Sequence, residues 1–246
     1  MSDTPDGLWL CTNPLLKQFD QRLFKRLNQQ ADVRCWSYIQ TADEPCSIEV
    51  AIDLLHNYLK QQSQPVHLIG HSLSGIVGLL YARQYPEQVK SLTLLSVGAK
   101  PAAGWHAHYY ALRQLLPCNR ATVLNQMVRL LFGPQSPAKA AGIAKLLAQV
   151  LDTELAPHSL GHRDTVSQGR IEPPLLVCHG SQDVIMDANA KILWKQWLKP
   201  GDRLWECPEG RHFFHYEYPD RSSRPILEFW QPSTYQSGLS LVELTL

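Results

Sequence analysis

A serine between an apolar strand and an apolar helix is the first residue whose type and position could do chemistry. In PVHLIGHSLSGIVGLLYARQYP, the apolar run ends at Gly70, and Ser72 follows just before a helical pattern begins. Small flanking residues permit a sharp strand-to-helix turn that exposes the hydroxyl. N–H groups at the start of the helix, with the Leu73 N–H among them, would stabilise a developing oxyanion. Ser74 is a rival nucleophile, but in the first helical turn it is expected to cap or pack.

The segment resembles the nucleophile elbow of the α/β-hydrolase superfamily, written G-x-S-x-G. GHSL at positions 70–73 fits the motif, while Ser74 stands at the final glycine position and Gly75 comes next. The side chain of His71 should point in a different direction from that of Ser72, so we expect His71 to pack against its neighbours and not to take part in catalysis. The resemblance covers residues 8–230, and it implies a catalytic triad in the chain order serine, acid, histidine.

The resemblance also implies where the acid and the base lie. Asp183 follows the run PPLLVCHG and a turn, as in the superfamily's H-G-x-x-D segment, whereas Asp187 is expected to cap a helix. His212 matches G-x-H before aromatic residues, and its competitor His215 is expected to form surface or core hydrogen bonds. We predict that Ser72 Oγ approaches one ring nitrogen of His212 to about 2.6–3.2 Å. Asp183 should contact the other nitrogen.

The second oxyanion donor should come from the loop after the first strand. In WLCTNPLL, Thr12 and Asn13 occupy the place where many relatives have an H-G run. The backbone N–H of Asn13 or Thr12 is therefore the candidate. An oxyanion hole that lacks one donor would lose about 10²–10³ in rate.

Composition excludes several classes of partner. Lys and Arg number 23 against 22 Asp and Glu, which predicts no attraction to nucleic acid. The start MSDTPDG lacks the order of a signal peptide, and no apolar run reaches membrane-spanning length, so a cytoplasmic protein is expected. The six cysteines form no C-x-x-C pair, and we expect reduced core residues and neither metal nor cofactor.

Short apolar runs alternate with amphipathic stretches, which is typical of a mostly parallel α/β sheet. Strands are predicted at Leu8–Thr12, Val33–Ile39, Pro65–Gly70, Val89–Val97, Leu175–Cys178 and Arg203–Cys207. Helices are predicted at Leu15–Gln29, Ser47–Lys60, Leu73–Tyr85, Ala188–Leu198 and Ser222–Trp230. The expected fold is an α/β-hydrolase sheet of about six strands with helices on both faces. Few residues precede the first strand, so the strand hairpin that begins most relatives should be missing.

A helical block interrupts the alternation. We expect core segments at residues 1–99 and 171–230, a helical lid at 100–170, and a tail at 231–246 that forms an extra strand or a short arm. The lid contains three helical patterns separated by Pro and Gly. Trp105, Tyr109 and Tyr110 gather near its start and are candidates to line an apolar acyl pocket, although packing of the lid on the core is the alternative for most of them.

These residues predict a serine hydrolase that cleaves a carboxylic ester, thioester or related acyl bond of a small molecule. The same triad could instead perform C–C cleavage, lyase or cofactor-free peroxidase chemistry. A non-catalytic binding or scaffold protein is the third possibility, because the Thr12-Asn13 loop departs from the superfamily pattern.

Overall fold

The computed structural model describes residues 4–44, 47–99, 104–160, 169–186 and 189–231. Six strands form one parallel sheet in the order β2-β1-β3-β4-β5-β6. The strands are β1 (Gly7–Cys11), β2 (Val33–Ser37), β3 (Val66–His71), β4 (Val89–Leu95), β5 (Leu175–Gly180) and β6 (Arg203–Cys207). The predicted fold class is confirmed, and no antiparallel strand precedes β1 among the described residues.

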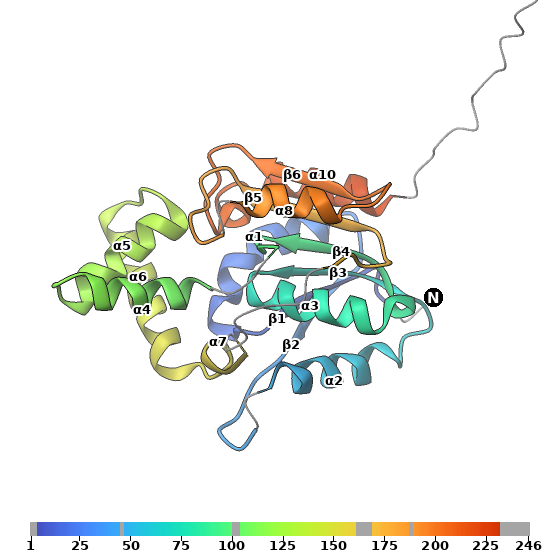
Figure 1. The fold of residues 1–246 in the computed structure, drawn as a ribbon, viewed down its shortest axis with the longest axis horizontal. Helices are drawn as coiled ribbons and strands as arrows, with labels where there is room; N and C mark the ends of the chain where they lie inside the picture. The colour runs from blue at the N-terminus through green and yellow to red at the C-terminus, as the bar shows by residue number, and fades with distance from the viewer. Residues whose placement is uncertain (1–3, 45–46, 100–103, 161–168, 187–188, 232–246) are drawn as a thin grey trace, which may run out of the picture.

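Helices cover both faces of the sheet (Figure 1). Apolar side chains of α2 (Ile48–Leu59), α3 (Leu73–Gln84) and α8 (Ala190–Trp197) pack on one face. The other face packs against α1 (Lys17–Leu27) and α10 (Pro219–Trp230). The short helices η1 (Pro14–Leu16), η2 (Pro86–Gln88) and α9 (Phe214–Glu217) lie in the connections. The strands β3 and β5 are buried along almost their whole length because helices cover them on both sides.

Within its described residues, the block after β4 folds as four helices, the first three of which lie beyond one end of the strands (Figure 1). They are α4 (Trp105–Leu115), α5 (Arg120–Phe132), α6 (Pro137–Thr153) and α7 (Ala156–Ser159), of which α7 was not predicted. The apolar cluster of α4, α5 and α6 includes Phe19, Ile185 and Phe213, so this cap packs on segments that surround the carboxyl edge of the sheet, whereas Ala156 of α7 joins the cluster on the α2 and α3 face. Residues 100–103 and 161–168 of the predicted lid lie outside the described residues, as do residues 232–246 of the tail.

Within the described ranges, no helix combines the length and apolar character needed to cross a membrane.

Candidate active site

Ser72 occupies a strained turn between β3 and α3. Its φ is 49° and its ψ is −121°. This left-handed backbone conformation costs a residue other than glycine about 1–3 kcal/mol. The Ser72 N–H donates to the Leu95 carbonyl at 2.9 Å, which ties the turn to β4. The chain can turn this sharply because Gly70 and Gly75 face each other: a Cβ on Gly70 would lie 2.7 Å from the Gly75 nitrogen. This packing is what the elbow motif requires.

Asp183 and His212 lie in contact in the loops after β5 and β6. His212 Nδ1 lies 3.0 Å from Asp183 Oδ2, and both side chains are 1% exposed. Asp183 Oδ1 also accepts hydrogen bonds from the N–H groups of Ile185 at 2.9 Å and Met186 at 3.3 Å. Burial alone would raise the pKa of Asp183, but the charge and hydrogen bond of His212 hold it below its usual value. Asp183 is therefore an oriented carboxylate that fixes the His212 ring.

The backbone of His212 is held from two sides. Its carbonyl accepts hydrogen bonds from His71 Nε2 and from Ser96 Oγ, each at 2.9 Å. The His71 ring, next in sequence to Ser72, lies 4.8 Å from the His212 ring, centroid to centroid. His212 Nε2 is buried without a hydrogen-bond partner among the described residues, so the predicted bond to Ser72 Oγ is not formed here. The arrangement leaves the basic nitrogen of an oriented imidazole beside the elbow.

The loop after β1, where we expect the second oxyanion donor, is hydrogen-bonded to α3. The Thr12 N–H donates to Ser74 Oγ at 3.0 Å, and the two side-chain hydroxyls also lie 3.0 Å apart. This donor therefore has a partner already, and Ser74 links the loop to α3. Asn13 Oδ1 accepts a hydrogen bond from the Leu16 N–H at 3.4 Å. Asn13 Nδ2 is buried and has no partner among the described residues.

A second buried aspartate–histidine pair lies behind His71. His215 Nε2 lies 2.9 Å from Asp20 Oδ1, and Trp9 Nε1 donates to Asp20 Oδ2 at 3.1 Å. The His71 and His215 rings are 4.7 Å apart. His215 thus forms the core hydrogen bond that we expected of it, but no motif in the sequence indicated Asp20 as its partner.

A metal ion is the other ligand that this cluster could hold, because ligand atoms of Asp20, His71 and His215 lie within 4.8 Å of one another. Asp20 and His215 bond directly to each other, however, and His71 Nε2 donates to the His212 carbonyl. We therefore assign these three side chains to hydrogen bonding within the core. The competing acid Asp187 lies outside the described residues.

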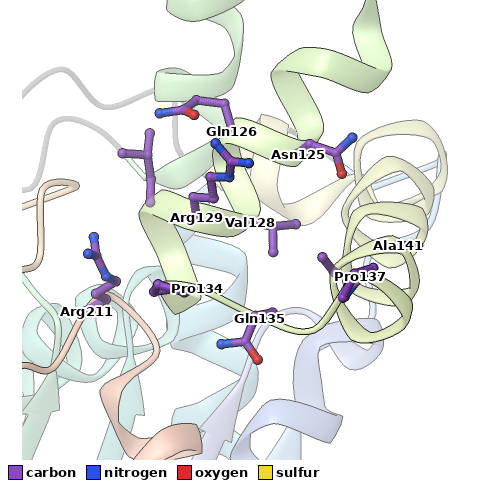
Figure 2. Close-up of a pocket in the computed structure, with 12 residues that line it drawn as sticks. Asn125, Gln126, Val128, Arg129, Pro134, Gln135, Pro137, Ala141 and Arg211 are labelled. Carbon is purple, nitrogen blue, oxygen red and sulfur yellow. The ribbon is translucent and has the colours of Figure 1, made fainter.

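The aromatic residues predicted to line the acyl pocket differ in their exposure to solvent. Trp105 and Tyr109 are buried in the apolar cluster of the cap, while Tyr110 is 44% exposed. The cavity in Figure 2, of about 890 Å³, is a different one, since its lining includes none of these residues and not Ser72. Arg129 of α5 and Arg211, which precedes His212, both border it (Figure 2). The aromatic lining stays a prediction.

Comparisons with known proteins agree with this fold. The model of the alpha/beta hydrolase family matches residues 9–223. An uncharacterized protein of Synechocystis sp. is 43% identical over 96% of this chain and 94% of its own length. A serine hydrolase of Mus musculus is 24% identical over 74% of this chain and 59% of its own. The structure of a meta-cleavage product hydrolase from Pseudomonas fluorescens matches with a TM-score of 0.71 and 13% identity, over 93% of this chain and 91% of that one. The chain belongs to the alpha/beta hydrolase family.

Proposed function

We propose that the protein is a serine hydrolase that cleaves a carboxylic ester, thioester or related acyl bond through an acyl-enzyme. The observation that carries the proposal is the buried Asp183–His212 contact, which leaves Nε2 of the ring without a partner beside the strained turn at Ser72. A base needs a fixed tautomer and a free acceptor nitrogen near its nucleophile. His215 also has a ring nitrogen without a partner among the described residues, but it meets its aspartate through Nε2, whereas His212 meets Asp183 through Nδ1 and keeps Nε2 for the nucleophile, as the triad mechanism requires.

The proposed mechanism follows from these roles. Ser72 Oγ attacks the acyl carbon while His212 Nε2 takes the hydroxyl proton, and Asp183 stabilises the resulting imidazolium through Nδ1. The tetrahedral intermediate then expels the alcohol or thiol, which receives that proton from His212. Water attacks the acyl-enzyme in the same way, which releases the acid and returns Ser72 to its starting state.

The oxyanion would be stabilised by the Leu73 N–H at the start of α3 and by a second donor from Asn13. Since the Thr12 N–H is bonded to Ser74 and Asn13 Nδ2 is buried without a partner among the described residues, we assign the second donor to the Asn13 side-chain amide. An orphaned buried N–H group costs about 1–3 kcal/mol, and an oxyanion would satisfy it.

The substrate would be a small molecule with an apolar acyl group. The cap packs on loops at the carboxyl edge, where it would exclude water from the acyl site and strengthen the oxyanion interactions. Within the proposed lid at residues 100–170, Trp105, Tyr109 and Tyr110 are the side chains that we expect to contact the acyl chain. A series of p-nitrophenyl esters of increasing acyl length tests this, and a flat profile of kcat/KM would contradict it.

A fluorophosphonate probe tests the nucleophile directly, because it forms a covalent bond to an activated serine. The wild type and Ser74→Ala should be labelled, whereas Ser72→Ala should not. On an ester substrate, loss of Ser72 or His212 should lower kcat by about 10⁶, and Asp183→Asn by about 10⁴. Labelling that survives Ser72→Ala would refute the proposal. Labelled Ser72 without turnover of any ester would instead favour C–C bond cleavage by the same residues.

A further inference from the structure

The cavity beside α5 is lined by two arginines and, among the described residues, by no acidic side chain. Arg129 of α5 and Arg211 border it (Figure 2). The rest of the lining consists of apolar side chains of α5 and α6, the loop between these helices, and the amides of Asn125, Gln126 and Gln135. Its volume of about 890 Å³ is that of a pocket for a small organic molecule, about 300–1,000 Å³, and is far more than a single inorganic ion needs.

The two arginines lie on the same side of the end of α5. The Gly133 N–H donates to the Arg129 carbonyl at 3.0 Å, so position 133 follows Arg129 by one helical turn and lies on the same face of the helix. The Arg211 side chain lies against Gly133, because a Cβ at this glycine would be 3.0 Å from Arg211 Nε. Gly133 also has a φ of 74°, which disfavours any side chain there. The glycine thus leaves room for Arg211 beside the helix that carries Arg129.

Neither guanidinium group forms an ion pair or a hydrogen bond with any of the described residues. Glu209 and Glu217 border an adjoining cavity together with Arg211, but neither pairs with it, and Glu217 accepts from Lys139 at 3.1 Å. Arg129 lies in the last turn of α5, where a cation offsets the helix dipole, but that role does not account for Arg211. A guanidinium offers a planar fork of N–H donors that matches a carboxylate or a phosphate. Two such unpaired groups on one cavity favour an anionic ligand.

We propose that this cavity binds an organic acid with an apolar body. Arg129 and Arg211 hold its carboxylate or phosphate group, and its apolar part lies along α5 and α6. Ser72 is not among the residues that line the cavity, so the acid binds outside the acyl site of the proposed hydrolase.

The bound acid would join the cap to the loop that carries His212. This loop already contacts the end of α5, since the Phe213 N–H donates to the Leu131 carbonyl at 3.1 Å. The rings of Phe213 and Phe132 also stack, with centroids 4.6 Å apart. An acid held from both segments should therefore slow local opening of α5 and of the loop together.

Isothermal titration calorimetry of the full chain with four probes tests the proposal. Octanoate and octyl phosphate carry an anionic group on an apolar chain, octanamide keeps the chain without the charge, and inorganic phosphate keeps a charge without the chain. We expect at least one of the two acids to bind, and the tighter of them tells a carboxylate site from a phosphate site. Octanamide and inorganic phosphate should bind at least tenfold more weakly. Raising NaCl from about 50 to 300 mM should weaken binding of the acid, because salt screens the charges.

Variants locate the binding site. Arg129→Gln and Arg211→Gln should each raise the Kd of the acid by about tenfold or more, because each removes a charge-assisted hydrogen bond. The control Arg224→Gln removes the same charge from an exposed position of α10 and should leave the Kd unchanged. In the wild type the acid should slow amide hydrogen exchange in α5 and in residues 209–213. Arg129 is exposed, so Arg129→Gln should stay folded and lose this protection.

A last arm separates this site from the acyl site. Phosphonylation of Ser72 by a fluorophosphonate blocks the acyl site, and the acid should still bind to the labelled protein. If Ser72 is not labelled, the serine hydrolase proposal fails, while the titrations of the arginine variants still decide the anion site. No binding of either acid at millimolar concentration, equal binding of octanamide, or an unchanged Kd in either arginine variant would overturn the proposal. Binding that phosphonylation abolishes would place the acid in the acyl site and overturn it as well.

Discussion

The hydrogen bond from His71 to the carbonyl of His212 offers a sharp test of how the site is positioned. His71 Nε2 and Ser96 Oγ each donate to that carbonyl at 2.9 Å; His212 and Ser96 are buried, and His71 is half-buried. His71→Leu removes one donor and keeps most of the side-chain volume. His71→Gln places an amide donor close to the position of Nε2. The two variants therefore differ mainly in the hydrogen bond.

The losses of stability and of activity expected for His71→Leu depend on which hydrogen bonds the His212 carbonyl keeps. The His212 carbonyl keeps the Ser96 hydroxyl, so it is not orphaned, and the net cost to the free energy of unfolding is about 0.5–1.5 kcal/mol. Catalysis should suffer more, because a shift of about 1 Å in the base can cost about 10² in rate. We expect kcat/KM of His71→Leu to fall by about 10- to 100-fold.

Two measurements on the same samples separate positioning from stability. Ester hydrolysis gives kcat and KM, and urea unfolding at pH 8 gives the free energy of unfolding. His71→Gln should recover most of kcat. The double variant His71→Leu with Ser96→Ala should lose more than the product of the single effects, because the carbonyl then has no donor. Full kcat/KM in His71→Leu would refute the view that this bond holds the base in place.

Two further predictions concern Asn13 and His67. Asn13→Ala should lower kcat on a p-nitrophenyl ester by about 10²–10³ with little change in KM. The control Thr12→Ser, which keeps the contact to Ser74, should have a kcat near that of the wild type. Equal kcat in all three proteins would show that Asn13 does not belong to the oxyanion hole. Burial, and secondarily Lys90, lowers the pKa of His67 to about 4. Because the unfolded chain binds this proton below about pH 6.5, stability should fall as the pH drops from about 6.5 to 4, by up to about 3 kcal/mol from this residue. Urea unfolding should show a flatter pH slope in His67→Phe, and an unchanged slope would contradict the assignment.

The elements that sequence patterns predicted well are those whose signal is local. The strand before Ser72 was predicted at Pro65–Gly70 and is found at Val66–His71, because a buried parallel strand reads as a continuous apolar run. The turn at Ser72 followed from small neighbours on both sides, since a Cβ on Gly70 would clash with the Gly75 nitrogen at 2.7 Å. The short helix α7 carried too few residues for a period to appear.

The contacts that sequence reasoning missed join residues far apart in the chain. Asp20 and His215 are 195 positions apart, and neither lies in a motif that indicates the other. The bond between the Thr12 N–H and Ser74 Oγ depends on how β1 and α3 pack, which no local pattern encodes. A sequence motif predicts which type of residue lies at the edge of the sheet. The direction in which each hydrogen-bond donor points depends on tertiary packing.

The two buried aspartate–histidine pairs show why geometry, and not residue type, separates a candidate base from a structural histidine. In His215 the aspartate takes Nε2, and the ring lies behind His71. In His212 the aspartate takes Nδ1, which leaves Nε2 as the nitrogen without a partner. Each ring thus has one nitrogen without a partner among the described residues, Nδ1 in His215 and Nε2 in His212, and only His212 meets its carboxylate through Nδ1, as the triad mechanism requires. If His215 served as the base instead, its proton acceptor would have to be Nδ1, and Asp20→Asn would then abolish activity as fully as Asp183→Asn. We expect Asp20→Asn to lower the free energy of unfolding and to leave most of kcat in the protein that stays folded.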